Sequence, residues 1–306
     1  MEAVKHFIEV IMTPSAPVFI IGGLIVLIVP ILVHLWVTKS TKYTVLPSIL
    51  LTGPSGAGKT ALHTLLERRG IPSETHTSQT WSTIELAVGE DGPGSSSSSW
   101  RDDLDAKGAT ATKFLLVDTP GHGKLRHYAA GRLTAEGTQS ARLKAVVFVV
   151  DAAALSEPDA LADAAAYLYD VLLALQRRMG STRTSKAPYA IPVLVAANKT
   201  DLFTAHPAKL VRNSLERELG RIRRTRSKGL LDSGVAQDGA LAGGDDADDW
   251  LGEYGSSDFK FDQMREFDTE VDVISGNIVG DGPGVDAWWN WMGSRISVWQ
   301  GDRKHN

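Results

Sequence analysis

The sequence contains no cysteine, which excludes disulfides, zinc–cysteine sites and catalysis by a thiol. It also lacks a surplus of one charge, because 32 lysines and arginines stand against 36 aspartates and glutamates for a net charge of −4. Such a chain has no broad basic field for binding DNA or anionic lipid. Hydrophobic residues fill 43% of the 306 positions, enough for a domain with a buried core. Function must therefore be sought in local motifs.

One stretch lacks fixed charge altogether. Residues 18–37 read VFIIGGLIVLIVPILVHLWV, and as a helix these 20 residues would span about 30 Å, the thickness of a hydrocarbon core. Lys39 and Lys42 follow the stretch, which favours a cytosolic side for the chain from residue 38 onward. We expect a lumenal tail at 1–17 and a transmembrane helix at 18–37. A cleaved signal peptide is the alternative, but a basic start and an A-x-A-like cleavage site are missing.

A phosphate-binding motif follows the first apolar strand. Residues 53–60 read GPSGAGKT between a strand-like run at 45–52 and a helical run at 61–69. In this arrangement backbone N–H groups face the phosphates, Lys59 neutralises the β and γ oxygens and Thr60 ligates Mg²⁺. The predicted nucleotide contacts are Gly53, Pro54, Ser55, Gly56, Ala57, Gly58, Lys59 and Thr60. The motif contacts only the phosphates, so it does not distinguish ATP from GTP.

A second motif, Asp-Thr-Pro-Gly-His, follows the apolar run at 114–117. Asp118 is predicted to hold Mg²⁺ through water, and the Gly121 amide to hydrogen-bond the γ-phosphate. His122 stands where Ras-like proteins place the glutamine that orients the attacking water, and either that role or contact with a partner is open to it. Lys59, Gly121 and His122 form the predicted catalytic set. No arginine is identifiable as a finger in cis, so hydrolysis should be slow and regulated by a partner.

The run at 193–197 delivers Asn198-Lys199-Thr200-Asp201. Guanine presents N1–H and N2–H₂ donors together, and the Asp201 carboxylate can accept from both, whereas adenine has no such pair. This motif selects GTP over ATP. Asn198 is predicted to tie the loop to the phosphate loop, and the Lys199 stem to lie along the base.

Two further contacts are expected from loops. A threonine between residues 74 and 84 should complete the Mg²⁺ shell, and spacing from the phosphate loop favours Thr77, with Thr80 as the alternative. The predicted metal ligands are thus Thr60, Thr77 and Asp118. Ser275 and Gly276 begin a Ser-Gly-Asn sequence where Ser-Ala-Lys is common, and a backbone N–H there is expected to reach guanine O6.

Six strand-like runs alternate with helical ones, which predicts an α/β fold: a doubly wound, mostly parallel sheet of the small GTPase type, preceded by one transmembrane helix. The runs are 45–52, 83–88, 114–117, 145–150, 193–197 and 271–274, and the clearest helices are 160–179 and 207–224. Within the GTPase domain at 38–306, the Gly- and Ser-rich residues 89–110 and the Gly- and Asp-rich residues 229–257 are predicted to be flexible insertions.

These motifs, in this order behind an apolar segment, resemble the family of signal recognition particle receptor beta subunits. Residues 145–151 look like the family's fourth strand, 167–172 like its next helix, and 215–219 with 223–226 like the helix after the guanine motif. The resemblance implies a GTPase related to the ADP-ribosylation factor group, single-pass in the endoplasmic reticulum membrane. Its GTP-bound form would bind the N-terminal domain of the receptor alpha subunit and help bring ribosomes to the translocon, with no direct DNA binding.

Other functions stay open at this point. A constitutive membrane scaffold could hold GTP as a structural ligand, and a small GTPase of endoplasmic reticulum or Golgi vesicle transport could share the motifs. An ATP-driven transporter component or a kinase is disfavoured by the guanine motif and by the single predicted span.

Overall fold

The computed structural model describes residues 16–40, 46–68, 74–88, 112–134, 142–181, 190–232, 250–252 and 258–304. The chain divides into two compact units, Met1–Val45 and Leu46–Asn306. The first contains helix α2 (Ala16–Ser40), which includes the predicted span at 18–37; the span itself remains a prediction. Large apolar side chains of α2 are exposed, among them Val26 and Trp36. Of the helices in the described ranges, none is long and apolar enough to cross a membrane.

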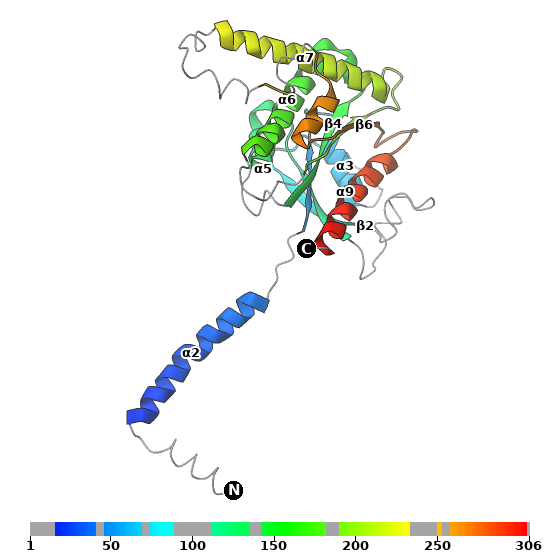
Figure 1. Ribbon diagram of the computed structural model, residues 1–306. Helices are drawn as coiled ribbons and strands as arrows, with labels where there is room; N and C mark the ends of the chain where they lie inside the picture. The colour runs from blue at the N-terminus through cyan, green and yellow to red at the C-terminus, as the bar shows by residue number, and fades with distance from the viewer. Residues whose placement is uncertain are drawn as a thin grey trace. The chain divides into compact units, whose positions relative to one another are not determined.

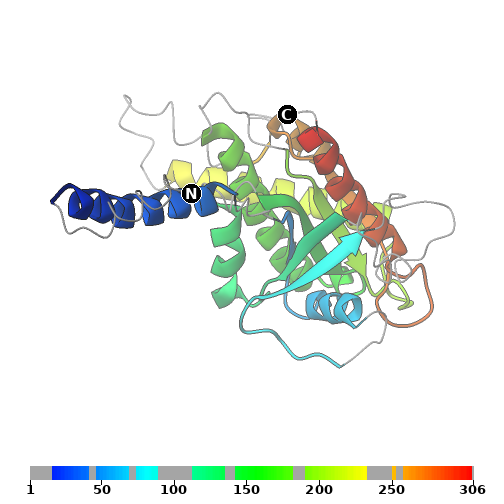
Figure 2. The ribbon, with the colours of Figure 1, turned by 90° about the horizontal axis from the view of Figure 1, so that it is seen from below.

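The second unit is built on one sheet of six strands in the order β2-β3-β1-β4-β5-β6. The strands are β1 (Ser48–Thr52), β2 (Ser82–Val88), β3 (Thr112–Asp118), β4 (Leu143–Asp151), β5 (Val193–Asn198) and β6 (Val271–Ser275). All neighbours pair in parallel except β2, which runs antiparallel to β3 at one edge (Figure 2). The predicted mostly parallel α/β sheet is confirmed.

Helices cover both faces of this sheet, because its central strands are apolar on both sides. In β4, Val146 and Phe148 belong to one core cluster, while Val147 and Val149 belong to the other, as expected for side chains that alternate across a strand. The first cluster packs against α5 (His127–Leu133), α6 (Pro158–Ser181), α7 (Ala208–Asp232) and the 3₁₀ helix η5 (Phe261–Phe267). The second packs against α3 (Lys59–Glu67) and α9 (Asp286–Lys304), and Figure 1 shows both layers.

The expected insertion at 229–257 is only partly described, and its described parts belong to the body of the domain. Helix α7 continues to Asp232, and Leu251 is fully buried. Arg223, itself buried, lies over the Trp250 ring at 4.7 Å and donates to the Leu251 carbonyl at 3.1 Å. Because residues 229–257 are rich in glycine and aspartate as a whole, their composition does not reveal the apolar residues Trp250 and Leu251. Residues 89–110, the other expected insertion, lie outside the described residues.

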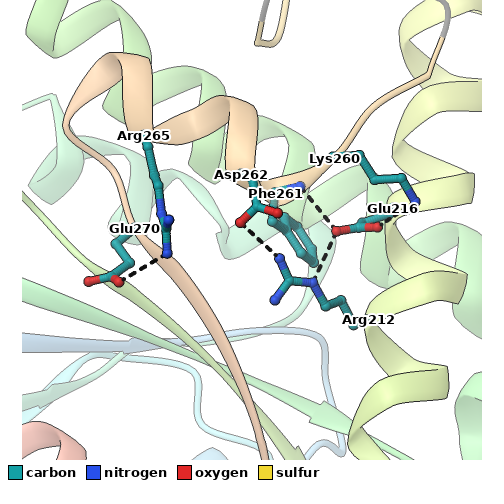
Figure 3. Close-up of polar contacts among 7 residues, drawn as sticks. All are labelled: Arg212, Glu216, Lys260, Phe261, Asp262, Arg265 and Glu270. Atoms are coloured by element: carbon teal, nitrogen blue, oxygen red, sulfur yellow. Dashed lines mark hydrogen bonds and ion pairs between the residues drawn. The ribbon is translucent and has the colours of Figure 1, made fainter.

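A buried glutamate joins α7 to η5, the element that leads into β6 (Figure 3). Glu216 is only 4% exposed and accepts from Arg212 Nε at 3.1 Å and from the Phe261 backbone N–H at 3.1 Å. Lys260 Nζ completes its shell at 3.0 Å, and Arg212 also reaches Asp262. These bonds satisfy a carboxylate that would otherwise be costly to bury, and they fix the chain that enters β6.

Candidate nucleotide-binding site

A cavity of about 190 Å³ lies beside the carboxyl ends of β1 and β3. It is lined by the loop between β1 and α3, by residues 75–78 ahead of β2, and by Gly121 just after β3. Polar groups from three distant parts of the sequence therefore meet at one edge of a mostly parallel sheet, where α/β folds place their ligands.

Two glycines allow the loop from β1 to α3 to lie close to its neighbours. Gly53 has φ 136°, and a Cβ there would collide with the Val149 carbonyl in the adjacent strand. Gly58 has φ 103°, and a Cβ there would collide with the Asn198 side chain. Helix α3 starts at Lys59 with no side-chain cap, so the N–H groups of its first turn are available to an anion.

Lys59 is a buried cation whose ammonium donates to the Pro54 carbonyl at 2.7 Å. Burial lowers its pKa from 10.5 to about 8, against the opposing charge of Asp118, while Arg126 lowers it further. A cation that is buried in this way is stabilised most by an anion in direct contact with it. Lys59 thus suits a phosphate, as its place in the motif predicts.

Asp118 and Thr60 form the second polar pair of the cavity. Thr60 Oγ1 donates to Asp118 Oδ2 at 2.7 Å, and Asp118 is only 1% exposed. Burial raises the pKa of the Asp118 carboxyl, while the bond from Thr60 and the charge of Lys59 lower it. The other oxygen, Oδ1, is buried and meets no hydrogen-bond partner in the described part of the chain. A carboxylate oxygen left over beside a threonine hydroxyl fits a hydrated Mg²⁺.

The segment at 75–78 brings a hydroxyl that the sequence analysis overlooked. Thr77 lines the cavity but is exposed, whereas Ser78 is half-buried and its Oγ lies 3.3 Å from Thr60 Oγ1. The alternative candidate, Thr80, is exposed and is not among the lining residues. The motif predicts a threonine at this place, but a serine hydroxyl offers the same ligand atom.

Gly121 and His122 differ sharply in placement. Gly121 is buried, and a Cβ on it would lie 2.5 Å from both the Gly53 carbonyl oxygen and Lys59 Nζ. His122 is exposed, lies outside the set of lining residues and begins the short 3₁₀ helix η1 (Gly123–Leu125). Its Nδ1 accepts from the Lys124 N–H at 3.3 Å, so a neutral ring carries its proton on Nε2.

In the base-binding motif, Asn198 bonds to the phosphate loop, as predicted. It is 3% exposed, and its Nδ2 donates to the Ala57 carbonyl in the phosphate loop at 2.8 Å. Lys199 has φ 61°, and its Nζ pairs with Asp151 Oδ2 at 2.6 Å, a partner at the end of β4 that the sequence analysis did not identify. Asp201 is exposed, as a group that receives a base from solvent has to be.

The loop after β6 is held to β5 and to the base-binding motif through Gly276. The Gly276 N–H donates to the Ala197 carbonyl at 2.9 Å, and the Gly276 carbonyl accepts from Thr200 Oγ1 at 2.9 Å. Ser275 is the last residue of β6. Asn277 is 3% exposed and turns its side chain onto its own loop, accepting from the Gly284 N–H at 2.8 Å. The loop is thus shaped by an asparagine amide.

Comparisons with known proteins point to one family. The family described as "Signal recognition particle receptor beta subunit" matches residues 44–267. The beta subunit of Saccharomyces cerevisiae is 32% identical over 184 residues, covering 60% of this chain and 61% of the relative, so the chain spans about three fifths of that relative's length.

Two solved structures from Chaetomium thermophilum extend the likeness. The receptor SRb-GTP/SRX complex is 46% identical with a TM-score of 0.67, over 81% of this chain and 100% of that one. The SRb-GDP-Mg structure is 47% identical with a TM-score of 0.59, over 83% and 100%. The small-GTPase fold expected from the sequence is confirmed by these structures.

Proposed function

The chain belongs to the signal recognition particle receptor beta subunit family, and from that premise we propose that it is a GTP-binding protein of the receptor, anchored in a membrane. The observation that carries the nucleotide part is the meeting of a buried ammonium, Lys59, with the Thr60–Asp118 pair at one sheet edge. Related chains named as GTP and GDP-Mg structures support the same ligands.

In this proposal the loop from Gly53 to Thr60 holds the phosphates through its N–H groups and Lys59. Thr60, Asp118 and a hydroxyl from Thr77 or Ser78 hold Mg²⁺, which when bound would neutralise charge on the phosphates. The remaining contacts are the Gly121 amide to the γ-phosphate, and Asn198, Lys199, Asp201 and the loop beginning at Ser275-Gly276 to the base.

Hydrolysis of GTP is proposed to be slow and set by a partner. His122 is exposed and is not one of the residues that line the cavity, so a bound partner can set the orientation of the imidazole ring. With Nδ1 accepting from a backbone N–H, Nε2 is a donor in the neutral ring and would have to be turned toward a water to act.

The membrane anchor is proposed to be residues 18–37, with the GTPase domain in the cytosol at the endoplasmic reticulum. The uncharged run and the exposed apolar side chains of α2, such as Val26 at 74% and Leu27 at 64%, support it. Extraction of cell membranes at alkaline pH tests this: the full chain should stay with the membrane, and a Leu27→Arg/Val29→Arg variant should be released. Retention of that variant would contradict the anchor.

The partner is proposed to be the receptor alpha subunit, bound as a heterodimer by the GTP form, with contacts to the ribosome or translocon following from that assembly. Support comes from the relative solved as an SRb-GTP/SRX complex. Immobilised full chain loaded with a GTP analogue should capture the N-terminal domain of the alpha subunit, and chain loaded with GDP should capture much less.

One experiment tests the central claim. The full chain, purified in mild detergent, is denatured and its released nucleotide is identified, and GTP hydrolysis is followed with and without the alpha-subunit domain. Guanine nucleotide and slow turnover that the partner alters are expected. Recovery of ATP would overturn the proposal, and partner binding that is equal with GTP and GDP would favour a constitutive scaffold in which GTP is structural.

A further inference from the structure

Arg126 lies at the junction between the switch motif and helix α5. Its backbone ends η1 and begins α5, while its side chain turns back so that Nε donates to the Gly121 carbonyl at 3.4 Å. The arginine therefore contacts the glycine proposed to sense the γ-phosphate. None of the sequence motifs includes this residue.

Two residues of α6 hold the guanidinium in place. Its terminal nitrogen donates to both oxygens of Asp163, at 2.8 and 2.7 Å, and the group lies over the Tyr167 ring at 4.3 Å. The Arg126 side chain is 21% exposed. Charge pairing with two bonds and stacking on an aromatic face each restrict a guanidinium, and here they act together.

Tyr167 carries the connection to the phosphate loop. The ring is 3% exposed, and its hydroxyl bonds to Thr52 Oγ1 at 2.5 Å. Thr52 ends β1 and directly precedes Gly53. Burial raises the pKa of the Tyr167 phenol above its ordinary value. Through Tyr167, Arg126 fastens the switch loop to the strand from which the phosphate loop emerges.

A second cluster of the same composition joins α7 to α6. Arg226 of α7 lies over the Tyr169 ring at 4.3 Å and pairs with Asp170 at 2.9 Å. Stacking and pairing are thus shared by both clusters, and the bond to Gly121 belongs to Arg126. The Arg226 cluster provides a matched control for the loss of an arginine–tyrosine–aspartate contact.

We infer that Arg126 is a positioning residue for γ-phosphate recognition: by holding the Gly121 carbonyl, it keeps this glycine against the phosphate loop, where its amide can meet the γ-phosphate. A glycine has wide backbone freedom, and a bond to its carbonyl removes much of it. A Cβ on Gly121 would lie 2.5 Å from both Lys59 Nζ and the Gly53 carbonyl oxygen, so this glycine already lies against the phosphate loop. The inference rests on the proposed function.

The test compares affinities for two ligands in the full chain, purified in detergent with Mg²⁺. The probes are GDP and a non-hydrolysable GTP analogue. In Arg126→Ala the ratio of GTP-analogue to GDP affinity should fall about fivefold to tenfold, the loss of one restrained hydrogen bond. Arg126→Lys keeps the charge but not the planar fork, so it should give a smaller fall in the same direction. Arg226→Ala should leave the ratio unchanged.

The ratio separates positioning from general stability, because a merely structural loss lowers both affinities together. If the wild-type chain binds guanine nucleotides and both Arg126 variants keep its ratio, the inference is overturned while the proposed function stands. If the wild-type chain binds no guanine nucleotide, the proposed function fails and the inference fails with it. Should Arg126→Ala not fold, the ratio in Arg126→Lys decides alone.

Discussion

The two ends of the candidate site are built differently. At the phosphate end the polar groups are buried and bonded to one another: Lys59 is 5% exposed and Asp118 is 1% exposed. At the base end Asp201 is exposed, and the loops around it are held by buried asparagines. Charges kept from water at one end are stabilised mainly by a charged ligand, whereas the exposed carboxylate at the other end distinguishes one base from another. Affinity and selectivity are thus expected to reside at different ends.

The largest effect should fall at the phosphate end. Lys59→Met removes the buried ammonium, and affinity for GTP and GDP alike should drop about a hundredfold or more, as for a truncated buried charge contact. The nucleotide-free protein should keep its stability, because the methionine fills the space of the apolar stem. Nucleotide titration and thermal unfolding measure both effects. Lys113→Met, at a lysine with a 60% exposed side chain, is the control and should change neither.

The same lysine makes the phosphate end sensitive to pH. Folding lowers its pKa from 10.5 to about 8, so between these values the unfolded chain holds a proton that the folded chain has lost. Stability of the nucleotide-free protein should therefore rise with pH through this window, by at most about 3 kcal/mol. A bound nucleotide should suppress the rise, because its phosphates keep the ammonium charged.

Thermal unfolding from pH 7.5 to pH 10 checks this, with and without Mg²⁺ and GDP. Lys59→Met serves as the control because it lacks the titrating group. Parallel pH curves for this variant and the wild type would show that Lys59 is not the source.

At the base end the effect should be smaller and confined to selectivity. Asp201→Asn replaces an ionised acceptor with a neutral amide, so guanine affinity should fall about tenfold or more while the fold is kept. Competition between GTP and ATP measures the change. Asp170→Asn removes an exposed aspartate of α6 that pairs with Arg226 and should leave the preference intact. A preference for GTP that survives in Asp201→Asn would remove the distinction between the two ends.

The smallest effect concerns the segment ahead of β2. Ser78→Ala should weaken Mg²⁺-dependent binding of a GTP analogue about threefold to tenfold, and Thr77→Ala should weaken it less, because the Ser78 hydroxyl lies beside Thr60. GDP binding should hardly change in either variant. A larger loss of affinity in Thr77→Ala than in Ser78→Ala would indicate that Thr77 is the ligand.

The sequence allowed prediction of those features that adjacent residues encode. Apolar runs such as the one in β4 predict strands that are buried on both faces. The loop from Gly53 to Thr60 has its phosphate-binding residues at consecutive positions, so its sequence predicts its function. Contacts between distant positions could not be predicted in this way. The pairing of Lys199 with Asp151 and the bond of Arg126 to Gly121 depend on how strands and helices pack.

The loop after β6 shows a related limit. From the motif, a backbone N–H of the loop Ser275-Gly276-Asn277 was expected to reach guanine O6, but the motif could not show that the Gly276 N–H donates to the Ala197 carbonyl. Within residues 229–257, likewise, composition predicted flexible chain, but Trp250 and Leu251 contact Arg223 of α7. The boundaries of helices and strands, and short apolar segments inside polar stretches, depend on tertiary contacts that the average composition of a stretch does not reveal.

The bond from Asn198 to Ala57 joins two residues of the protein, so it requires no atom of the nucleotide. The base loop is thus ordered in advance, and its conformational entropy is not lost a second time on binding. A preformed base end should capture guanine at a rate close to that of simple encounter. Ser78 and Gly121 line the phosphate end, so we expect a factor that speeds nucleotide exchange to act on the segments around them.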